Sequence, residues 1–437
     1  MMMKKITIGI IGLGTVGTGV MRILRSNSKI IRERLGAALS VKKIADLDIK
    51  SDRGIRLPKG ILTKDAQEII NDPSIDVVVE LIGGCEPAKT LLMGAMAEGK
   101  HVVTANKALL ASHGIELLKA AHHAQVDIGF EASVAGGIPI IKALKEGFAA
   151  NRIRFILGIL NGTANYILST MTNEGGNFSD ILKEAQRQGY AESDPVLDIE
   201  GLDTAHKLAI LISMAYGTTI TAEDIYTEGI SHIEPLDIEF ARELGYKIKL
   251  LAIAREIGSQ IEARVHPTLI PHEHLLSKVD GTYNAIFLDG DAVGPSMFYG
   301  KGAGMMPSGG AVISDIIDIA RNILTGSSNR VPFFSHQPEY LRKIIIKNIK
   351  EIETRYYLRF SVDDRPGVLS KLSGILGKHN ISIHSVIQKG RRNKGGVSIF
   401  LLTHESREAA LRKALDHIDH LSLTRAKTMV IRIEDQI

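Results

Sequence analysis

The chain has 437 residues, 44% of them hydrophobic and 23% charged, with a formal net charge of +4 and a single cysteine, Cys85. This length accommodates two or three globular domains, and one cysteine excludes both an intrachain disulfide and a metal site built from several cysteines. No apolar run reaches the roughly 18 residues of a membrane-spanning helix, and the basic residues are not gathered with aromatic ones, so we expect a cytoplasmic protein that binds neither membranes nor nucleic acids.

The first 137 residues alternate apolar strands with helical segments. The expected strands are KKITIGIIG, VKKIADLD, IDVVVELIGG, HVVTANK and QVDIGFEASV. Strands that are apolar throughout and interleaved with helices indicate a parallel sheet covered on both faces. We therefore predict an α/β protein in which residues 1–137 form a Rossmann-type doubly wound sheet, completed by residues 305–345.

Two further domains are expected after this sheet. Residues 138–304 are richer in helix and are predicted to form an α+β domain for substrate binding, catalysis and dimerisation. Residues 353–437 follow the order βαββαβ, which is typical of a small ferredoxin-like module.

A glycine-rich loop, GLGTVG, follows the first strand and opens a helix. Gly12 allows the tight turn, Gly14 lets the backbone approach a pyrophosphate, and Gly17 permits close helix packing. The N-terminus of the helix, beginning at Thr15 and Val16, supplies N–H groups and a positive dipole end. The strand, loop and helix together predict a dinucleotide-binding site formed by these five residues.

The type of dinucleotide is left open by the residues that follow the second strand. Asp46 and Asp48 favour NAD, because a carboxylate at this point binds the ribose 2′-hydroxyl. Lys43 and Arg53 lie near enough in sequence to hold a 2′-phosphate, so NADP is also possible.

An acidic stretch, GYAESDPVLDIEGLDTAHK, leads into a strongly apolar helix that begins near Gly201. Asp203 and Lys207 are four residues apart and share a helix face, which fits a plain N-cap with its salt-bridge partner. Lys107, however, follows an apolar parallel strand at the edge where such sheets bind ligands. Carboxylates for an ammonium group and a lysine for a reacting oxygen suit an amino-acid aldehyde or alcohol, so we favour a substrate site.

Several long segments resemble homoserine dehydrogenase of the monofunctional type with a C-terminal ACT domain. They are GLGTVGTGV, VVVELIGG, VVTANKALL, FEASVAGGIPII, LNGTANYIL, GYAESDPVLDIEGLDTAHKLAIL and GKGAGMMPSGGAVISDI. The resemblance implies NAD(P)-dependent interconversion of L-aspartate 4-semialdehyde and L-homoserine, in the biosynthesis of threonine, methionine and isoleucine. It also implies that Lys207 exchanges the proton, that Asp203 and Glu192 hold the amino acid, and that Lys107 lies beside cofactor and substrate.

The same resemblance implies further ligand contacts. Gly189 and Gly304 would approach the cofactor, and Thr163 would contact the substrate. The segment EASVAGGIP matches a loop for a monovalent cation, sodium, whose ligands would be the Glu131 side chain and the backbone carbonyls of Val134, Gly136 and Ile138. A glycine-rich hinge in which the glutamate caps a helix explains that segment equally well.

The C-terminal segment DDRPGVLSKLSGILGKHNISI resembles an ACT domain, with Pro366 at the first position of a helix and Gly367 beside it. This implies feedback by an amino acid, threonine being the expected effector, in a homodimer or homotetramer. A packing domain without a ligand is the alternative.

Two residues depart from the family pattern. Leu47 stands where an arginine is common, which puts NADP preference in doubt, and Cys85 stands where a small residue such as threonine is expected. Two other functions stay open at this point. One is a different semialdehyde-handling dehydrogenase, such as the phosphorylating type that needs an activated cysteine. The other is a nucleotide-bound amino-acid sensor without catalysis.

Overall fold

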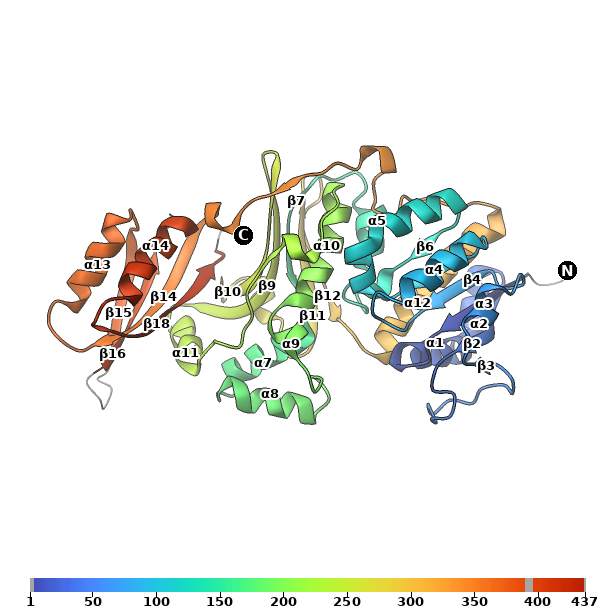
Figure 1. Ribbon diagram of the computed structural model, residues 1–437, viewed down its shortest axis with the longest axis horizontal. Coiled ribbons are helices and arrows are strands. Elements are labelled where there is room, and N and C mark those ends of the chain that lie inside the picture. Colours follow the sequence, from blue (N-terminus) through green and yellow to red (C-terminus); the bar gives the residue numbers. More distant parts are fainter. Residues whose placement is uncertain (1–3, 390–395, 436–437) are drawn as a thin grey trace. The chain divides into compact units, whose positions relative to one another are not determined.

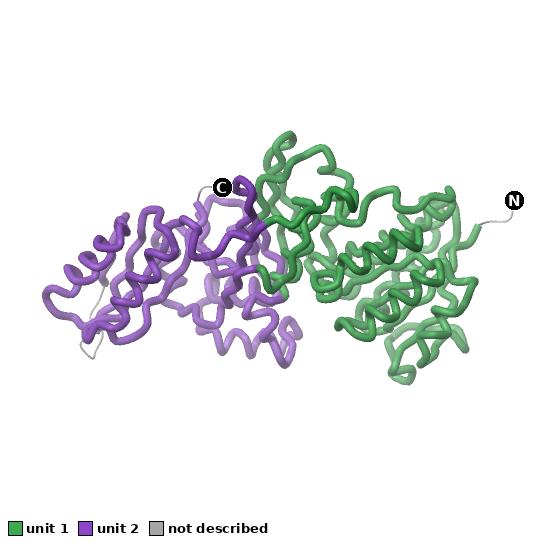
Figure 2. The backbone as a smooth tube through the Cα atoms, turned by 45° about the horizontal axis from the view of Figure 1, so that its top comes forward, with its two compact units in different colours: residues 1–156, 203–224, 283–344 green, residues 157–202, 225–282, 345–437 purple. Residues whose placement is uncertain are grey.

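The computed structural model describes residues 4–389 and 396–435, and its chain divides into two compact units (Figure 2). Unit 1 comprises residues 1–156, 203–224 and 283–344, and unit 2 comprises residues 157–202, 225–282 and 345–437. The chain passes between them five times, first within strand β7 (Ile153–Ile159) and next at the start of helix α10 (Leu202–Tyr216). Among the described residues, no helix has the length and apolar character needed to cross a membrane.

Unit 1 contains a parallel sheet in the order β3-β2-β1-β4-β5-β6, in which each neighbouring pair runs in the same direction (Figure 1). The central strand β4 is apolar and fully buried from Val77 to Val79, as expected for a strand covered on both faces. The predicted doubly wound sheet is therefore confirmed. Its strands are β1 (Lys5–Ile11), β2 (Ala38–Ala45), β3 (Leu62–Thr63), β4 (Val77–Glu80), β5 (His101–Thr104) and β6 (Ile128–Gly129).

Helices that follow these strands cover the sheet, and one helix from much later in the chain joins them. This late helix, α12, crosses α1 at Gly19 and Gly309. A Cβ at Gly19 would lie 2.0 Å from the Met305 carbonyl oxygen, so only glycine allows this approach. The helices are α1 (Thr15–Ser26), α2 (Ser28–Leu35), α3 (Gln67–Ile70), α4 (Ala88–Ala97), α5 (Lys107–Ala124) and α12 (Met305–Thr325).

The rest of unit 1 consists of helix α10 from Asp203 onward, the first part of β7, short helical turns and one hairpin. The turns are η1 (Glu131–Ser133), α6 (Ile140–Lys142), the π-helical turn η2 (Ala143–Gly147), η3 (Ala222–Asp224) and η5 (Pro338–Tyr340). The hairpin pairs β11 (Tyr283–Gly290) with β12 (Gly294–Lys301) in antiparallel register.

Unit 2 begins with helices and continues into a long antiparallel pair. Strands β9 (Tyr246–Ile257) and β10 (Gln260–Pro271) pair over their whole length. The shorter elements are α7 (Gly162–Asn173), α8 (Phe178–Arg187), α9 (Val196–Ile199), β8 (Tyr226–Thr227), α11 (Pro235–Glu243) and η4 (Leu275–Lys278).

The C-terminal part of unit 2 has the predicted βαββαβ order. A single correction concerns the start of α13, which lies at Val368. Its N-cap is Gly367, with a φ of +86°, so Pro366 precedes the cap rather than occupying the first helical position. The elements are β13 (Ile345–Ile346), η6 (Ile349–Glu351), β14 (Glu353–Asp363), α13 (Val368–Lys378), β15 (Ile383–Lys389), β16 (Gly396–Thr403), β17 (Ser406–Arg407), α14 (Glu408–Asp419) and β18 (Thr424–Ile433). The turn expected at 390–395 lies outside the described residues.

This C-terminal module continues the sheet of unit 2. Strand β18 pairs in parallel with β10 through Thr268 and Leu269. Beside that pairing, the fully buried Arg432 forms ion pairs of 2.8 Å with both Glu228 and Glu408. The module is thus held to the rest of unit 2 by backbone pairing and by a buried charge network.

Candidate active site

The glycine loop has the geometry that a dinucleotide requires. At Gly12 the φ is +102° and a Cβ would lie 2.8 Å from the Leu81 backbone, while at Gly17 a Cβ would lie 2.4 Å from the Gly12 carbonyl oxygen. At Gly14, the N-cap of α1, a Cβ would meet no atom within 4 Å. The loop is therefore closed toward the protein and open at the helix N-terminus, where a pyrophosphate would fit.

The carboxylate at the end of β2 is already used within the protein. Asp46 accepts the Leu13 backbone N–H at 2.5 Å, which ties it to the glycine loop. Arg53 pairs with Asp48 at 3.2 Å and reaches Asp46 at 3.7 Å. Arg53, which was a candidate for binding the 2′-phosphate of NADP, is thus already paired with two neighbouring acids.

A buried carboxylate in unit 1 is shared by two lysines. Asp203 lies 2.7 Å from the amino group of Lys207 and 3.1 Å from that of Lys107. The side chains of Asp203 and Lys207 are 9% and 11% exposed, whereas that of Lys107 is 41% exposed. Because α10 begins at Leu202, Asp203 lies inside the helix rather than at its N-cap. Burial lowers the pKa of the adjacent His206, so the His206 ring is neutral near neutral pH and adds no positive charge beside Asp203 and the two lysines.

The start of α5, which carries Lys107, is fixed by residues that sequence reasoning missed. Asn106 caps α5 by accepting the backbone N–H three positions further on at 3.0 Å, and its amide donates to the Gly84 carbonyl at 2.5 Å. One strand away, the fully buried Glu80 accepts the Thr104 hydroxyl at 2.6 Å. The sequence did offer one sign of this contact. Glu80 is the single acid at the end of the apolar strand VVVE, and an acid buried in such a strand requires hydrogen-bond partners.

Glu131 caps a helical turn in this structure. Its two carboxylate oxygens accept the backbone N–H groups of Ile141 and Lys142, both at 2.9 Å. Burial, together with the nearby Asp315, raises the pKa of Glu131 to about 7. A carboxylate and backbone carbonyls are hard oxygen donors, and each carboxylate oxygen retains a further lone pair, so the donor set still fits a monovalent cation. The ligand role of Glu131, and of the carbonyls of Val134, Gly136 and Ile138, stays a prediction.

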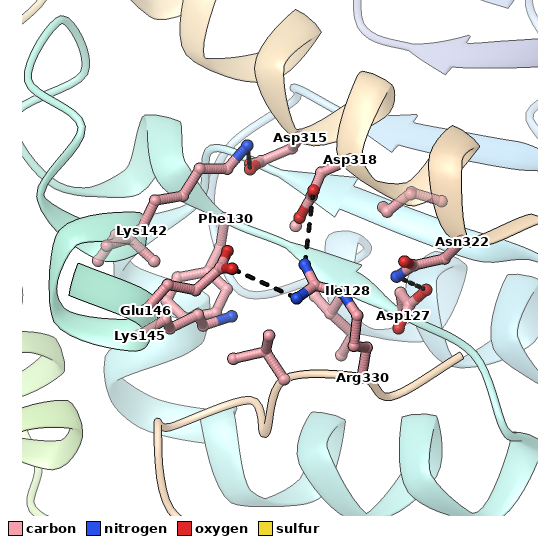
Figure 3. A pocket seen from close by; sticks show the side chains of 14 residues that line it. Asp127, Ile128, Phe130, Lys142, Lys145, Glu146, Asp315, Asp318, Asn322 and Arg330 are labelled. Carbon is pink, nitrogen blue, oxygen red and sulfur yellow. Dashed lines mark hydrogen bonds and ion pairs between the residues drawn. The ribbon is translucent and has the colours of Figure 1, made fainter. Parts of the chain in front are cut away.

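A small cavity lies beside Glu131, between β6, α12 and the turn η2 (Figure 3). Most of its polar side chains satisfy one another. Lys145 is different: its amino group points over the Phe130 ring, 4.3 Å from the centroid, and burial lowers its pKa to about 8. The pairs drawn in Figure 3 are Lys142 with Asp315, Arg330 with Glu146 and Asp318, and Asn322 with Asp127.

The remaining predicted residues fall in both units. In unit 2, the Thr163 hydroxyl donates to the Tyr190 carbonyl at 2.7 Å, which brings Thr163 to the segment that contains Gly189 and the exposed Glu192. At Gly189 the φ is +74° and a Cβ would meet nothing within 4 Å. In unit 1, Gly304 is the N-cap of α12 with a φ of +128°. Their contacts with ligands stay predictions.

Three family models match the chain in order. Residues 12–131 match the NAD-binding domain of homoserine dehydrogenase, residues 139–317 match homoserine dehydrogenase, and residues 356–419 match the ACT domain. A homoserine dehydrogenase of Neisseria gonorrhoeae is 46% identical over 432 residues, covering 99% of both chains. The chain belongs to the homoserine dehydrogenase family. A Bacillus subtilis homoserine dehydrogenase is 40% identical over 433 residues, again covering 99% of both chains.

Solved structures of homoserine dehydrogenases show the same architecture. A homoserine dehydrogenase from Thiobacillus denitrificans is 48% identical, with a TM-score of 0.93 and 99% coverage of both chains. A hyperthermophilic archaeal homoserine dehydrogenase in complex with NADPH is 27% identical, with a TM-score of 0.62, over 75% of this chain and 100% of that one. The expected class of enzyme is confirmed: an NAD(P)-dependent oxidoreductase acting on a CH–OH group. The matches give no support to the phosphorylating dehydrogenase or to the non-catalytic sensor.

Proposed function

We propose that this homoserine dehydrogenase interconverts L-aspartate 4-semialdehyde and L-homoserine with Lys207 as the proton donor and acceptor. One observation carries the assignment: a single buried carboxylate, Asp203, contacts Lys207 at 2.7 Å and Lys107 at 3.1 Å. Two lysines held by one acid at the starts of α5 and α10 supply the charge and the proton that an alkoxide-like oxygen requires.

The nicotinamide, when bound, supplies or accepts the hydride. The Lys207 amino group gives a proton to the aldehyde oxygen during reduction and takes it back from the hydroxyl during oxidation. Asp203 fixes the position of that amino group, because one of its N–H bonds is directed at the carboxylate. Lys107, which is more exposed, is proposed to lie beside the cofactor and the substrate.

The amino-acid part of the substrate is assigned to acidic and hydroxyl groups. We assign the substrate ammonium group to Asp203 and Glu192, because carboxylates pair with ammonium ions. Glu192 is exposed, so its charged carboxylate pays no desolvation penalty in the free enzyme. Thr163 already donates its hydroxyl proton to a carbonyl, so toward the substrate it would act as an acceptor. Gly189 and Gly304 are assigned to the cofactor.

For the cofactor, we propose that NAD(H) is used at least as well as NADP(H). Asp46 and Asp48 bring negative charge to the end of β2, and Arg53 is paired with both. Lys43 is also paired, at 2.8 Å with a glutamate of α3. Leu47, which is 86% exposed, offers no charge to a 2′-phosphate.

We also propose a sodium ion at Glu131 and the carbonyls of Val134, Gly136 and Ile138. A bound cation would favour the charged form of Glu131 and so offset the effect of burial on its pKa. Dialysis into sodium-free buffer that contains a bulky organic cation should lower activity, and added sodium should restore it. Unchanged activity throughout would argue for the capping role alone.

The ACT module is proposed to bind threonine as a feedback effector. The assembly is proposed to be a homodimer or homotetramer, supported by an exposed aromatic surface on the hairpin β11–β12. There Tyr283 and Tyr299 stack with ring centroids 5.0 Å apart and are 37% and 55% exposed. Exposed apolar surface of this kind often marks an interface. The cytoplasmic location remains a prediction.

One assay tests the proposed reaction. The protein is mixed with L-homoserine and NAD or NADP, and the absorbance of the reduced cofactor is followed with and without threonine. We expect reduced cofactor to form, at least as fast with NAD as with NADP, and threonine to slow it. No reduced cofactor with either dinucleotide would refute the proposed activity, whereas activity that ignores millimolar threonine would refute only the effector assignment.

A further inference from the structure

A second cavity, which is open to solvent, lies in unit 1 between α5 and α10. Its lining begins close to the two lysines along both helices. On α5, Leu110, Ala111 and Gly114 line the cavity and come three, four and seven residues after Lys107. On α10, Ile210 lines it and comes three residues after Lys207. Since one helical turn takes 3.6 residues, the cavity begins about one turn beyond Lys107 on α5 and beyond Lys207 on α10.

The lining combines apolar side chains with hydroxyl groups and one ionisable pair. Phe334 packs directly on α5, because a Cβ at Gly114 would lie 2.9 Å from the tip of its ring. The two ionisable side chains of the lining, His113 and Glu116, contact each other at 2.9 Å. The apolar lining residues are Leu110, Ile115, Ile210, Ile220 and Phe334, and the hydroxyl groups come from Ser112, Ser213, Thr219 and Thr221.

These properties define the kind of ligand. A concave space in which apolar side chains and a few hydrogen-bonding groups lie side by side is typical of a small-molecule site. Because Lys89 of α4 pairs with Glu116 at 2.5 Å, the carboxylate of the lining already has a counter-charge, and the cavity offers no uncompensated charge to an ion. The exposed Ser112 and Thr219 mark a polar opening, and the buried Ile210 and Phe334 an apolar interior.

We propose that this cavity binds a small, uncharged, branched aliphatic molecule with one hydroxyl group, and that its occupancy changes the contact between Lys107 and Asp203. The inference rests on the proposed roles of those residues. Lys107 is the first residue of α5 and Asp203 is in the first turn of α10, so each partner of the 3.1 Å contact is carried by one wall of the cavity. Closely packed helices transmit small shifts rather than absorb them.

Binding can be measured without any enzyme assay, because the chain contains no tryptophan. Ser112→Trp places a single fluorophore at the cavity opening. His122→Trp places one on an exposed position of the same helix outside the lining, as the matched control. Titration with 3-methylbutan-1-ol should shift the emission of Ser112→Trp saturably and leave that of His122→Trp unchanged. An equal or non-saturating response in both variants would refute the site.

The effect on catalysis is measured on the wild-type enzyme with the same alcohol. We expect a saturable change in kcat for homoserine oxidation of roughly fivefold, the low end of typical coupling between two sites. Ala111→Leu, which adds carbon atoms to the cavity wall, should abolish this response. Saturable binding without a change in kcat, or an equal response in Ala111→Leu, would refute the coupling. A protein that does not oxidise homoserine at all would refute the proposed function, and the fluorescence titration would still decide the site.

Discussion

Asp203 and Lys207 lie one helical turn apart on α10, and their side chains meet at 2.7 Å where both are almost fully buried. An unpaired charge in such a place costs several kcal/mol, so the pair explains how a strongly apolar helix can carry two charges. The second contact of Asp203, to Lys107, favours the proposal that the pair serves a substrate site in addition to the helix. A simple salt bridge within one helix needs only one lysine.

Replacement of Lys207 by methionine should nearly abolish turnover. The side chain keeps its length but loses the proton, so kcat should fall by roughly 10²- to 10⁴-fold, the usual contribution of a general acid–base group. Cofactor binding should change little, as measured from the change in fluorescence of the reduced nicotinamide on titration with the protein. Lys119→Met, at an exposed position of α5, is the control and should keep full activity. Near-normal kcat in Lys207→Met would remove the catalytic assignment.

Replacement of Asp203 by asparagine should lower both activity and stability. The two lysines would lose their shared counter-charge, and breaking a buried ion pair by removing one partner costs roughly 3 kcal/mol in the free energy of unfolding. Urea unfolding of the single variants and of Asp203→Asn with Lys207→Met tests this. The double variant should lose less than the sum of the two, because the mutated groups contact each other. Strict additivity would show that the contact contributes nothing.

The glycine loop allows a matched pair of substitutions. Gly12→Ala should destabilise unit 1, because the φ of +102° disfavours alanine and a Cβ would lie 2.8 Å from the Leu81 backbone. Gly14→Ala should fold normally, since its φ is −68° and a Cβ would meet no protein atom within 4 Å. The added methyl group would instead point into the space assigned to the pyrophosphate. We expect normal thermal unfolding and weakened cofactor binding in Gly14→Ala; unaltered cofactor affinity would place the dinucleotide elsewhere.

Leu47→Arg should raise the use of NADP. The residue is 86% exposed at the end of β2, so an arginine can be added there without burial cost and can face a 2′-phosphate. The measurement is kcat/KM for NADP relative to NAD, which we expect to rise by roughly tenfold, equivalent to one charge-assisted contact. Leu47→Gln controls for loss of the apolar side chain. If both variants show the same ratio, the charge at this position does not set the preference.

Local patterns predicted the parallel sheet, the glycine loop, the βαββαβ module and the Asp203 and Lys207 pair, because each depends on residues close in sequence. Contacts between distant segments were not predictable in this way. The crossing of α12 over α1 depends on Gly19 meeting Gly309, and either glycine alone looks like an ordinary helix residue. The pairing of β18 with β10 could not be predicted either, because the apolar pattern of a strand does not determine which other strand it pairs with. Pro366 was misplaced because Gly367 takes the cap.

The charge network around Arg432 predicts acid sensitivity of unit 2. Burial alone would raise the pKa of Glu228, but the charge and hydrogen bonds of Arg432 hold it at about 2, below the ordinary 4.5. The folded state therefore binds this proton less readily than the unfolded state. The stabilisation is complete above pH 4.5, falls as the pH drops toward 2, and amounts to on the order of 3 kcal/mol.

Glu228→Gln tests this acid sensitivity, because an amide keeps the shape of the side chain but cannot titrate. Urea unfolding of the full chain should show the variant to be less stable than wild type at pH 7, with the difference shrinking steadily between about pH 4.5 and pH 3 as wild type loses its advantage. Glu239→Gln, at an exposed position of α11, is the control and should follow wild type at every pH. A constant difference between Glu228→Gln and wild type across this range would mean that Glu228 titrates equally in both states, and the ion pair with Arg432 would then not control its proton.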